Sequence, residues 1–170
     1  MPAAAGLWIL RACDEAWLAR RTWCALLLAV AIAGCASTPQ ATPGRDAEAK
    51  QFNARPDAAA IYVYRDDFRS PSDDDNTVLF VDGRLIGATL PGTFFWIDMR
   101  AGEHQLHGLA RDHGTLRVDA RYGEITFVSL RALGWVSHFT RVEPETGKRD
   151  ILRCCSLMEN WAPGQRPLFR

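Results

Sequence analysis

The sequence has no excess of charge of either sign, because its 170 residues include 20 Lys and Arg and 20 Asp and Glu. Proteins that bind nucleic acids use surplus basic side chains to neutralise phosphates, so this balance argues against such a partner. The sequence also lacks a Gly-rich phosphate loop and the Gly-x-Ser-x-Gly context that presents a nucleophilic serine. These absences predict a protein that is not an enzyme, has no cofactor and does not bind nucleic acid.

The sequence also lacks an apolar run of about 20 residues, the length that a helix needs to cross a bilayer. Its longest apolar stretch, Thr22–Ala31, is about half that length and follows the basic pair Arg20-Arg21. A basic start, a short apolar stretch and small residues at its end are the three parts of an export signal. Here the ending is Ile32-Ala33-Gly34-Cys35, which resembles a bacterial lipobox.

We therefore predict a lipoprotein signal peptide over residues 1–34 and lipid attachment at Cys35, the first residue of the mature protein. A plain secretory signal ending in small residues is the alternative. The predicted partner is thus a membrane, bound through the lipid. By resemblance to known lipoproteins, Ala36 after the cysteine favours the periplasmic face of the outer membrane over the inner membrane.

The sequence has only five cysteines, and two of them, next to each other, are expected to remain as free thiols in the mature protein. Cys13 and Cys24 lie in the leader and Cys35 takes the lipid, which leaves the neighbours Cys154 and Cys155. The periplasm is oxidising, but Cα atoms of adjacent residues lie about 3.8 Å apart, below the usual disulfide range of roughly 4.4–6.8 Å. We expect one buried and one exposed thiol, with a vicinal disulfide or a bond to another chain left open. This pair is the candidate redox site.

Residues 35–57 are predicted to be the lipidated cysteine followed by a flexible, disordered linker. This segment is rich in proline, small and charged residues, and Phe52 is its one large apolar side chain. Such a composition cannot bury enough surface to order itself. We expect the linker to hold the folded part off the membrane.

From Ala58 onward, short apolar runs separated by turn signals predict an all-β domain. Asp82-Gly83 predicts a two-residue hairpin turn, because both residues tolerate the positive φ that such a turn requires. Residues 143–148 predict a loop between two further strands, over 139–142 and 149–152. We expect about eight strands in an antiparallel β-sandwich over residues 58–160, preceded by the signal helix and the linker. A C-terminal tail is expected over residues 161–170.

Several turns and strands of this domain resemble a known family. The segments are Val81-Asp82-Gly83-Arg84-Leu85-Ile86-Gly87, Pro91-Gly92-Thr93-Phe94 and Ala101-Gly102-Glu103-His104-Gln105-Leu106. They look like the PEGA type of surface β-sandwich, although the literal Pro-Glu-Gly-Ala string is absent. With Ile61-Tyr62-Val63-Tyr64-Arg65 in front and a lipobox upstream, the chain is similar to bacterial lipoproteins with domain of unknown function 2846. The resemblance implies an immunoglobulin-like sandwich over about residues 58–157, no established activity and no functional residues.

Four aromatic residues are the candidates for contact with a partner or a glycan: Tyr62, Tyr64, Trp135 and Trp161. The two tyrosines share one face of the first strand, and Ile61 and Val63 share the other, which predicts a central strand of the sandwich with both faces buried. The alternative is that the tyrosines form an exposed shelf that stacks on sugar rings. Trp135 is expected in a loop and Trp161 near the end of the fold, where sandwiches place binding surfaces. Both tryptophans could instead plug the ends of the sandwich.

No metal site is predicted. His104 and His107 lie three apart in an expected strand, so their side chains point to opposite faces. The acidic run Asp73-Asp74-Asp75 lacks the ligand spacing of an EF-hand loop.

The sequence thus predicts a lipid-anchored envelope protein whose sandwich is a non-catalytic binding or structural module. An envelope protein or a polysaccharide is the expected kind of partner. One alternative is a periplasmic thiol or redox module, or an enzyme, that uses Cys154 and Cys155. Another is a metal-stabilised polysaccharide-binding module.

Overall fold

The computed structural model describes residues 39–67, 77–108, 114–133 and 136–159. Within these ranges the chain forms nine strands and two helices, and neither helix is long and apolar enough to span a membrane. The helices are α2 (Pro43–Ala49) and α3 (Pro144–Cys154). The strands are β1 (Ala59–Arg65), β2 (Thr77–Val81), β3 (Arg84–Thr89), β4 (Thr93–Met99), β5 (Gly102–His107), β6 (Thr115–Ala120), β7 (Ile125–Leu133), β8 (Val136–Val142) and β9 (Ser156–Leu157).

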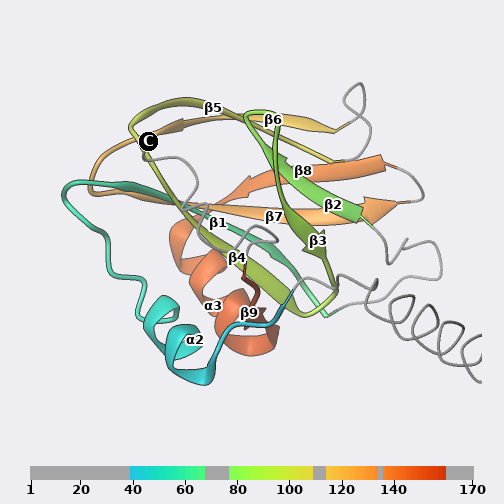
Figure 1. The fold of residues 1–170 in the computed structure, drawn as a ribbon, viewed down its shortest axis with the longest axis horizontal. Helices are drawn as coiled ribbons and strands as arrows, with labels where there is room; N and C mark the ends of the chain where they lie inside the picture. Colours follow the sequence, from blue (N-terminus) through green and yellow to red (C-terminus); the bar gives the residue numbers. More distant parts are fainter. Residues whose placement is uncertain (1–38, 68–76, 109–113, 134–135, 160–170) are drawn as a thin grey trace, which may run out of the picture. The chain divides into compact units, whose positions relative to one another are not determined.

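The strands form two sheets, so the predicted mostly β, two-sheet fold is confirmed (Figure 1). One sheet has the order β3-β2-β5-β6 and is antiparallel throughout. The other has the order β8-β7-β1-β4-β9 and is mixed, because β1 pairs in parallel with β7 and β4 with β9. The prediction of purely antiparallel pairing is therefore wrong. Parallel neighbours need a long connection, and the chain between β1 and β7 supplies it by building the second sheet.

Strand β1 is buried along all seven residues, because a different layer covers each of its faces. Ile61 and Val63 pack between the two sheets. Tyr62 and Tyr64 point the other way, into a second core that lies beneath the two helices. Figure 1 shows α2 and α3 on one side of the mixed sheet. The prediction that β1 is a central strand is confirmed, but helices rather than a sheet cover its tyrosine face.

Helix α3 occupies the region where the sequence predicts a loop and a strand. Pro144 lies in the first turn of the helix, where its fixed φ is compatible with helical structure and its missing N–H costs nothing. Gly147 and Ile151, four residues apart, form the buried face of α3. A Cβ at Gly147 would lie 2.5 Å from Cβ and Cγ of Phe127 on β7. The two residues that predict a turn therefore belong to a helix: Pro144 begins it, and Gly147 lets it pack closely against the sheet.

The segment before β1 is also folded, which corrects the prediction of a flexible linker up to residue 57. Thr42 caps α2 and Pro43 occupies its first turn. Ala49 at the end of the helix is fully buried, and the ring of Phe52 lies 5.5 Å from that of Tyr62. Short helices gain most of their stability from tertiary packing. The mixed sheet supplies here the apolar surface that the segment itself lacks.

The hairpin turn at Asp82-Gly83 is confirmed, with φ of 50° and 75° at the two residues. The Asp82 side chain also connects this turn to β5. Its Oδ1 accepts a hydrogen bond from the backbone N–H of Gln105 (2.9 Å), and its Oδ2 lies 2.7 Å from Nδ1 of His104. One residue thus makes the turn and helps to fix the neighbouring strand.

Candidate functional site

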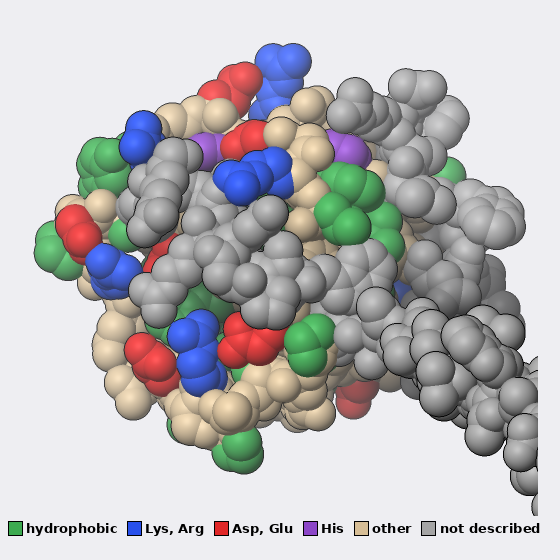
Figure 2. All heavy atoms as spheres, viewed as in Figure 1, with side chains coloured by type: hydrophobic (Ala, Val, Ile, Leu, Met, Phe, Trp, Pro, Cys, Tyr) green, Lys and Arg blue, Asp and Glu red, His purple; other side chains and the backbone are tan. Residues whose placement is uncertain are grey.

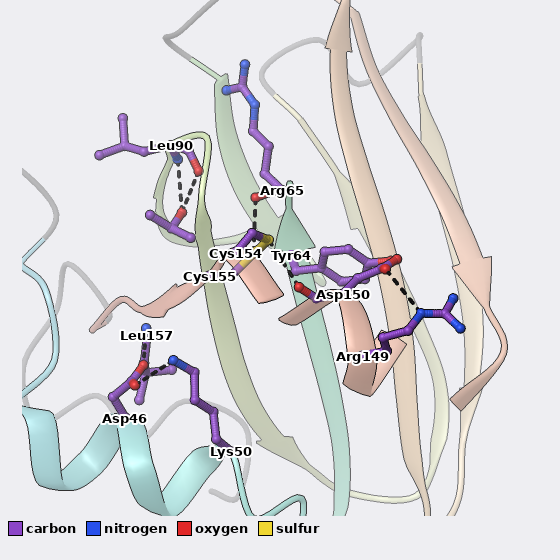
Figure 3. The surroundings of a disulfide bond; sticks show 11 residues. Asp46, Lys50, Tyr64, Arg65, Leu90, Arg149, Asp150, Cys154, Cys155 and Leu157 are labelled. Carbon is purple, nitrogen blue, oxygen red and sulfur yellow. Dashed lines mark hydrogen bonds and ion pairs between the residues drawn. A yellow bond between two sulfur atoms is a disulfide. The ribbon is translucent and has the colours of Figure 1, made fainter. Parts of the chain in front are cut away.

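Cys154 and Cys155 form a vicinal disulfide where α3 ends (Figure 3). Cys154 is the last residue of the helix, and the backbone N–H of Cys155 donates to the carbonyl of Ile151 (3.0 Å). At Cys155 the backbone becomes extended, with φ of −115° and ψ of 143°. The expectation of one buried and one exposed thiol is therefore wrong, and the structure contains the vicinal disulfide that the sequence leaves open. The bond therefore lies across the change from helix to strand.

Backbone carbonyl oxygens lie close to both sulfur atoms. Sγ of Cys154 lies 3.2 Å from the carbonyl oxygen of Asp150, one helical turn earlier. Sγ of Cys155 lies 3.6 Å from the carbonyl oxygen of Arg65 at the end of β1. Cys155 is only 3% exposed, whereas Cys154 is half-buried. Cys154 is thus the sulfur that a reactant can approach more readily.

The chain runs from the disulfide directly into β9, a two-residue strand at the edge of the mixed sheet. The backbone N–H of Ser156 donates to the carbonyl of Gly92 (3.0 Å), and that of Met158 donates to the carbonyl of Phe94 (2.9 Å). These bonds attach β9 to β4 and to the turn before it.

The segment 39–49, which carries α2 and is called here the docked segment, is held by β9. The backbone N–H of Ala41 donates to the carbonyl of Leu157 (2.9 Å), and that of Glu159 donates to the carbonyl of Pro39 (2.8 Å). The Asp46 carboxylate accepts from the backbone N–H of Leu157 (2.7 Å). Arg45 forms an ion pair with Glu159 at 3.3 Å. Strand β9 therefore connects the docked segment to the sheet.

We expect Asp46→Ala to loosen the docked segment more than Asp46→Asn. Both variants lose the ion pair with Lys50, in which Oδ2 of Asp46 lies 2.7 Å from Nζ. Only Ala also removes the acceptor of the Leu157 N–H, and an unsatisfied buried donor costs about 1 kcal/mol or more. Amide hydrogen exchange at Leu157 should be faster in Asp46→Ala than in Asp46→Asn. Equal exchange in the two variants would show that this hydrogen bond does not hold the segment.

Tyr62 and Tyr64 form the core beneath the helices and do not form an exposed shelf. They are 1% and 3% exposed. The Tyr62 hydroxyl donates to the carbonyl of Ala49 (2.9 Å), and that of Tyr64 donates to Oδ2 of Asp150 (2.9 Å). These contacts confirm the core interpretation, and burial excludes sugar stacking at either ring. Tyr64 instead connects β1 to the last turn of α3, beside the disulfide (Figure 3).

Burial keeps both phenols neutral. It is the main cause that raises the pKa of Tyr64 to about 12, and the neighbouring Asp150 carboxylate adds to the effect. Burial likewise raises the pKa of Tyr62 far above its ordinary value. Neither hydroxyl is therefore a general base or a nucleophile near neutral pH, because either role needs a pKa close to the working pH.

Trp96 is a further aromatic side chain near the site, and no local motif in the sequence marks it. It is half-buried on β4, and its ring stacks on that of Tyr62 at 6.1 Å. Its indole N–H donates to Oδ1 of Asp98 (2.8 Å), and the guanidinium of Arg45 lies 5.8 Å from its ring centroid. Burial raises the pKa of Asp98. The alternation of side chains along a strand could have predicted that Trp96 lies on the same face of the sheet as Tyr62. It could not have predicted that the docked segment covers this face.

The two described candidate histidines belong to separate environments. The ring nitrogens of His104 lie 2.7 Å from Oδ2 of Asp82 and 2.8 Å from the carbonyl oxygen of Arg100. His107 is buried and its ring stacks on that of Phe80 at 4.8 Å. A polar cavity of about 250 Å³ lies beside it, lined by Asp82, Gly83, Gln105, His107 and Thr115. Within the described ranges, no three His, Cys, Asp or Glu side chains are grouped so that they could hold a metal ion.

On the face shown in Figure 2, acidic and basic side chains are interspersed. Large hydrophobic side chains exposed in the described part of the chain are Leu85, Leu90, Tyr122 and Leu152. Three predicted site residues lie outside the described residues: Cys35, Trp135 and Trp161. The acidic run 73–75, where no metal site is predicted, also lies outside them.

The chain is similar to a bacterial protein. An uncharacterized protein of Haemophilus influenzae strain Rd is 31% identical over 130 residues, which cover 73% of this chain and 76% of that protein. No protein-family model and no solved structure matches the chain significantly. The comparison shows distant homology and gives no activity.

Proposed function

We propose that the chain, which belongs to the same family as the Haemophilus influenzae protein, is a lipid-anchored protein of the bacterial cell envelope. Its β domain would be a non-catalytic structural or binding module on the periplasmic face of the outer membrane. The observation that carries this proposal is the lipobox Ile32-Ala33-Gly34-Cys35 behind a short apolar stretch. The resemblance to lipoproteins with domain of unknown function 2846 supports the same proposal.

The docked segment adds a consequence for the position of the domain. Its first described residue, Pro39, contacts the fold and lies four residues after Cys35. A chain spans at most about 3.6 Å per residue, so the path from Cys35 to Pro39 would be no longer than about 14 Å. We therefore propose that the domain lies close to the membrane surface, and not at the end of a long flexible stalk.

The described side chains support a non-catalytic role. Tyr62 and Tyr64 are buried and neutral, and His104 has a hydrogen-bond acceptor at each ring nitrogen. A partner would then meet the edges of the antiparallel sheet, where β3 and β6 are the outer strands. Exposed Leu85 on β3 and Tyr122 after β6 are the apolar contacts that these edges offer an envelope protein or a polysaccharide.

The lipid anchor is tested by replacing Cys35 with Ser. We expect the wild-type chain, produced in a bacterial host with labelled palmitate, to carry the label and to fractionate with the outer membrane. Cys35→Ser should lose the label completely, because serine has no thiol to receive the lipid. The matched control is Cys154→Ser/Cys155→Ser, which should keep the label. An unlabelled wild-type chain, or a label that persists in Cys35→Ser, would contradict the proposal.

Thiol chemistry at Cys154 and Cys155 is a second candidate role, and the vicinal disulfide is the observation that favours it. Cys154 is half-buried and more exposed than Cys155, whose sulfur lies 3.6 Å from the carbonyl oxygen of Arg65 on β1. In this role the protein would exchange electrons with periplasmic dithiol proteins while it stays attached to the membrane.

A further inference from the structure

The disulfide lies next to the part of the fold that holds the docked segment. Cys155 is followed directly by Ser156 and Leu157, which form β9. Five backbone and side-chain hydrogen bonds connect residues 156–159 to their neighbours, two of them to β4 and its preceding turn and three to the docked segment. Any change in the backbone at residues 154–155 is therefore transmitted to β9 without an intervening residue.

The surroundings of the two sulfur atoms offer hydrogen-bond acceptors to the reduced pair. A thiol can donate a hydrogen bond, although a weak one, whereas a disulfide sulfur has no hydrogen to donate. The carbonyl oxygens of Asp150 and Arg65 lie 3.2 and 3.6 Å from the two sulfur atoms, so each thiol would have an acceptor nearby once the bond is broken and the sulfur atoms move apart. Such acceptors favour a reversible reduction of this pair.

Residues 154–155, where α3 turns into β9, are called here the corner. The disulfide should restrict the backbone of this corner more than the two free thiols do. A disulfide between neighbours closes a small ring that includes their peptide bond, which restricts the backbone at the point where α3 turns into β9. Ordering a backbone residue costs roughly 1–2 kcal/mol of conformational entropy, so a corner restricted in advance favours the docked arrangement. Strand β9 has only two residues, and short edge elements open locally at low free energy.

We propose that Cys154–Cys155 is a redox-modification site that accepts electrons from a dithiol protein, and that its oxidised form keeps β9 and the docked segment on the sheet. The reduced form releases this segment and lengthens the connection between lipid and domain. The inference rests on the proposed envelope location, because a reducing cytosol would keep both thiols free.

The chemistry is a complete thiol–disulfide exchange. A thiolate of the donor attacks Sγ of the more accessible Cys154, forms a mixed disulfide and displaces the Cys155 thiolate, which takes up a proton. The second thiol of the donor, as its thiolate, then attacks the donor's sulfur in the mixed disulfide. This step displaces the Cys154 thiolate, which is protonated in turn. Two electrons and two protons have moved to the cysteine pair, and the donor has become a disulfide.

Trypsin cleavage after Arg45 and Lys50 measures release of the docked segment. Both residues are held against the fold when the segment is docked: Arg45 forms an ion pair with Glu159, and Nζ of Lys50 lies 6.0 Å from the ring centroid of Phe94 on β4. The full-length protein in bacterial membranes is treated with reduced thioredoxin or left oxidised, and the peptides are followed by mass spectrometry. We expect reduction to accelerate cleavage at these two positions at least about fivefold. Cleavage after Arg121, in a turn far from the disulfide in the sequence, should not change.

Serine variants provide the matched control. Cys154→Ser, Cys155→Ser and the double variant cannot form the bond, so they should be cleaved at the rate of the reduced wild type, whatever the redox conditions. The comparison of oxidised with reduced wild type needs no substitution and so does not depend on the variants folding. Equal cleavage in the two states would overturn the proposal.

Trapping thiols with a maleimide in intact cells gives the oxidation state in the envelope. The proposal expects a substantial oxidised fraction, and a fully reduced pair would overturn it. The palmitate experiment is independent of both readouts. Redox-dependent cleavage in a chain that takes up no palmitate would support the switch and overturn the lipid anchor, so the two proposals fail separately.

Discussion

Replacing Tyr62 by Ala should lower the free energy of unfolding by about 3–5 kcal/mol, the range for truncation of a large buried ring. The ring lies at the centre of the core beneath the helices. Its centroid lies 5.4–6.1 Å from those of four other aromatic rings: two on β4, one on β7, and Phe52, which follows the docked segment. The protein around it is unable to collapse into the space left, because β1 is held between two other strands of the sheet.

Tyr62→Phe separates the contribution of the ring from that of the hydroxyl. This variant keeps the ring contacts and loses the hydrogen bond to the carbonyl of Ala49, which should cost about 1 kcal/mol. Urea unfolding followed by tryptophan fluorescence gives both values, provided that the slope with denaturant stays constant. A loss below about 1 kcal/mol in Tyr62→Ala would contradict a buried ring and would favour the exposed shelf.

The sequence was informative wherever one local pattern determines one local structure. Asp82-Gly83 makes its hairpin because few residue pairs tolerate positive φ at both positions. The alternation of Ile61, Tyr62, Val63 and Tyr64, apolar on both faces, correctly predicts a central strand. The pattern could not reveal which layer covers the tyrosine face, because a helix and a sheet bury the same apolar side chains.

The sequence-based predictions fail where tertiary contacts, and not the local sequence, determine the structure. The docked segment has a composition typical of a linker, and it is ordered by hydrogen bonds to β9, more than 100 residues later in the chain: Leu157 and Asp46 are separated by 111 positions. Pro144 and Gly147 indicate a turn in the sequence, but proline also occurs in the first turn of a helix and glycine at a close helix–sheet contact, as both do in α3. At the cysteine pair, sequence alone gives the distance between adjacent Cα atoms but not the surroundings of the sulfurs. The site is therefore visible from sequence only as two neighbouring cysteines.

Two helical glycines should respond in opposite ways to the same substitution. Alanine is favoured over glycine in a helix interior by about 1 kcal/mol. Gly44 in α2 has no atom within 4 Å of a Cβ placed on it, so Gly44→Ala should stabilise the protein, by about 0.5 kcal/mol in this first turn. Gly147 in α3 has Cβ and Cγ of Phe127 at 2.5 Å from such a Cβ. These atoms lie near the backbone of β7 and cannot swing away, so α3 itself must lift from the sheet.

We therefore expect Gly147→Ala to lower the free energy of unfolding by about 2 kcal/mol, because overpacking outweighs the gain in helix propensity. The lifted helix should also weaken the Tyr64–Asp150 hydrogen bond (2.9 Å) and disturb the corner at Cys154, so trypsin should cleave faster after Lys50 even when the disulfide is intact. Gly44→Ala should not accelerate this cleavage. If both substitutions stabilise the protein, residues 144–154 do not pack on β7 through Gly147, and the route from the disulfide to the docked segment must be revised.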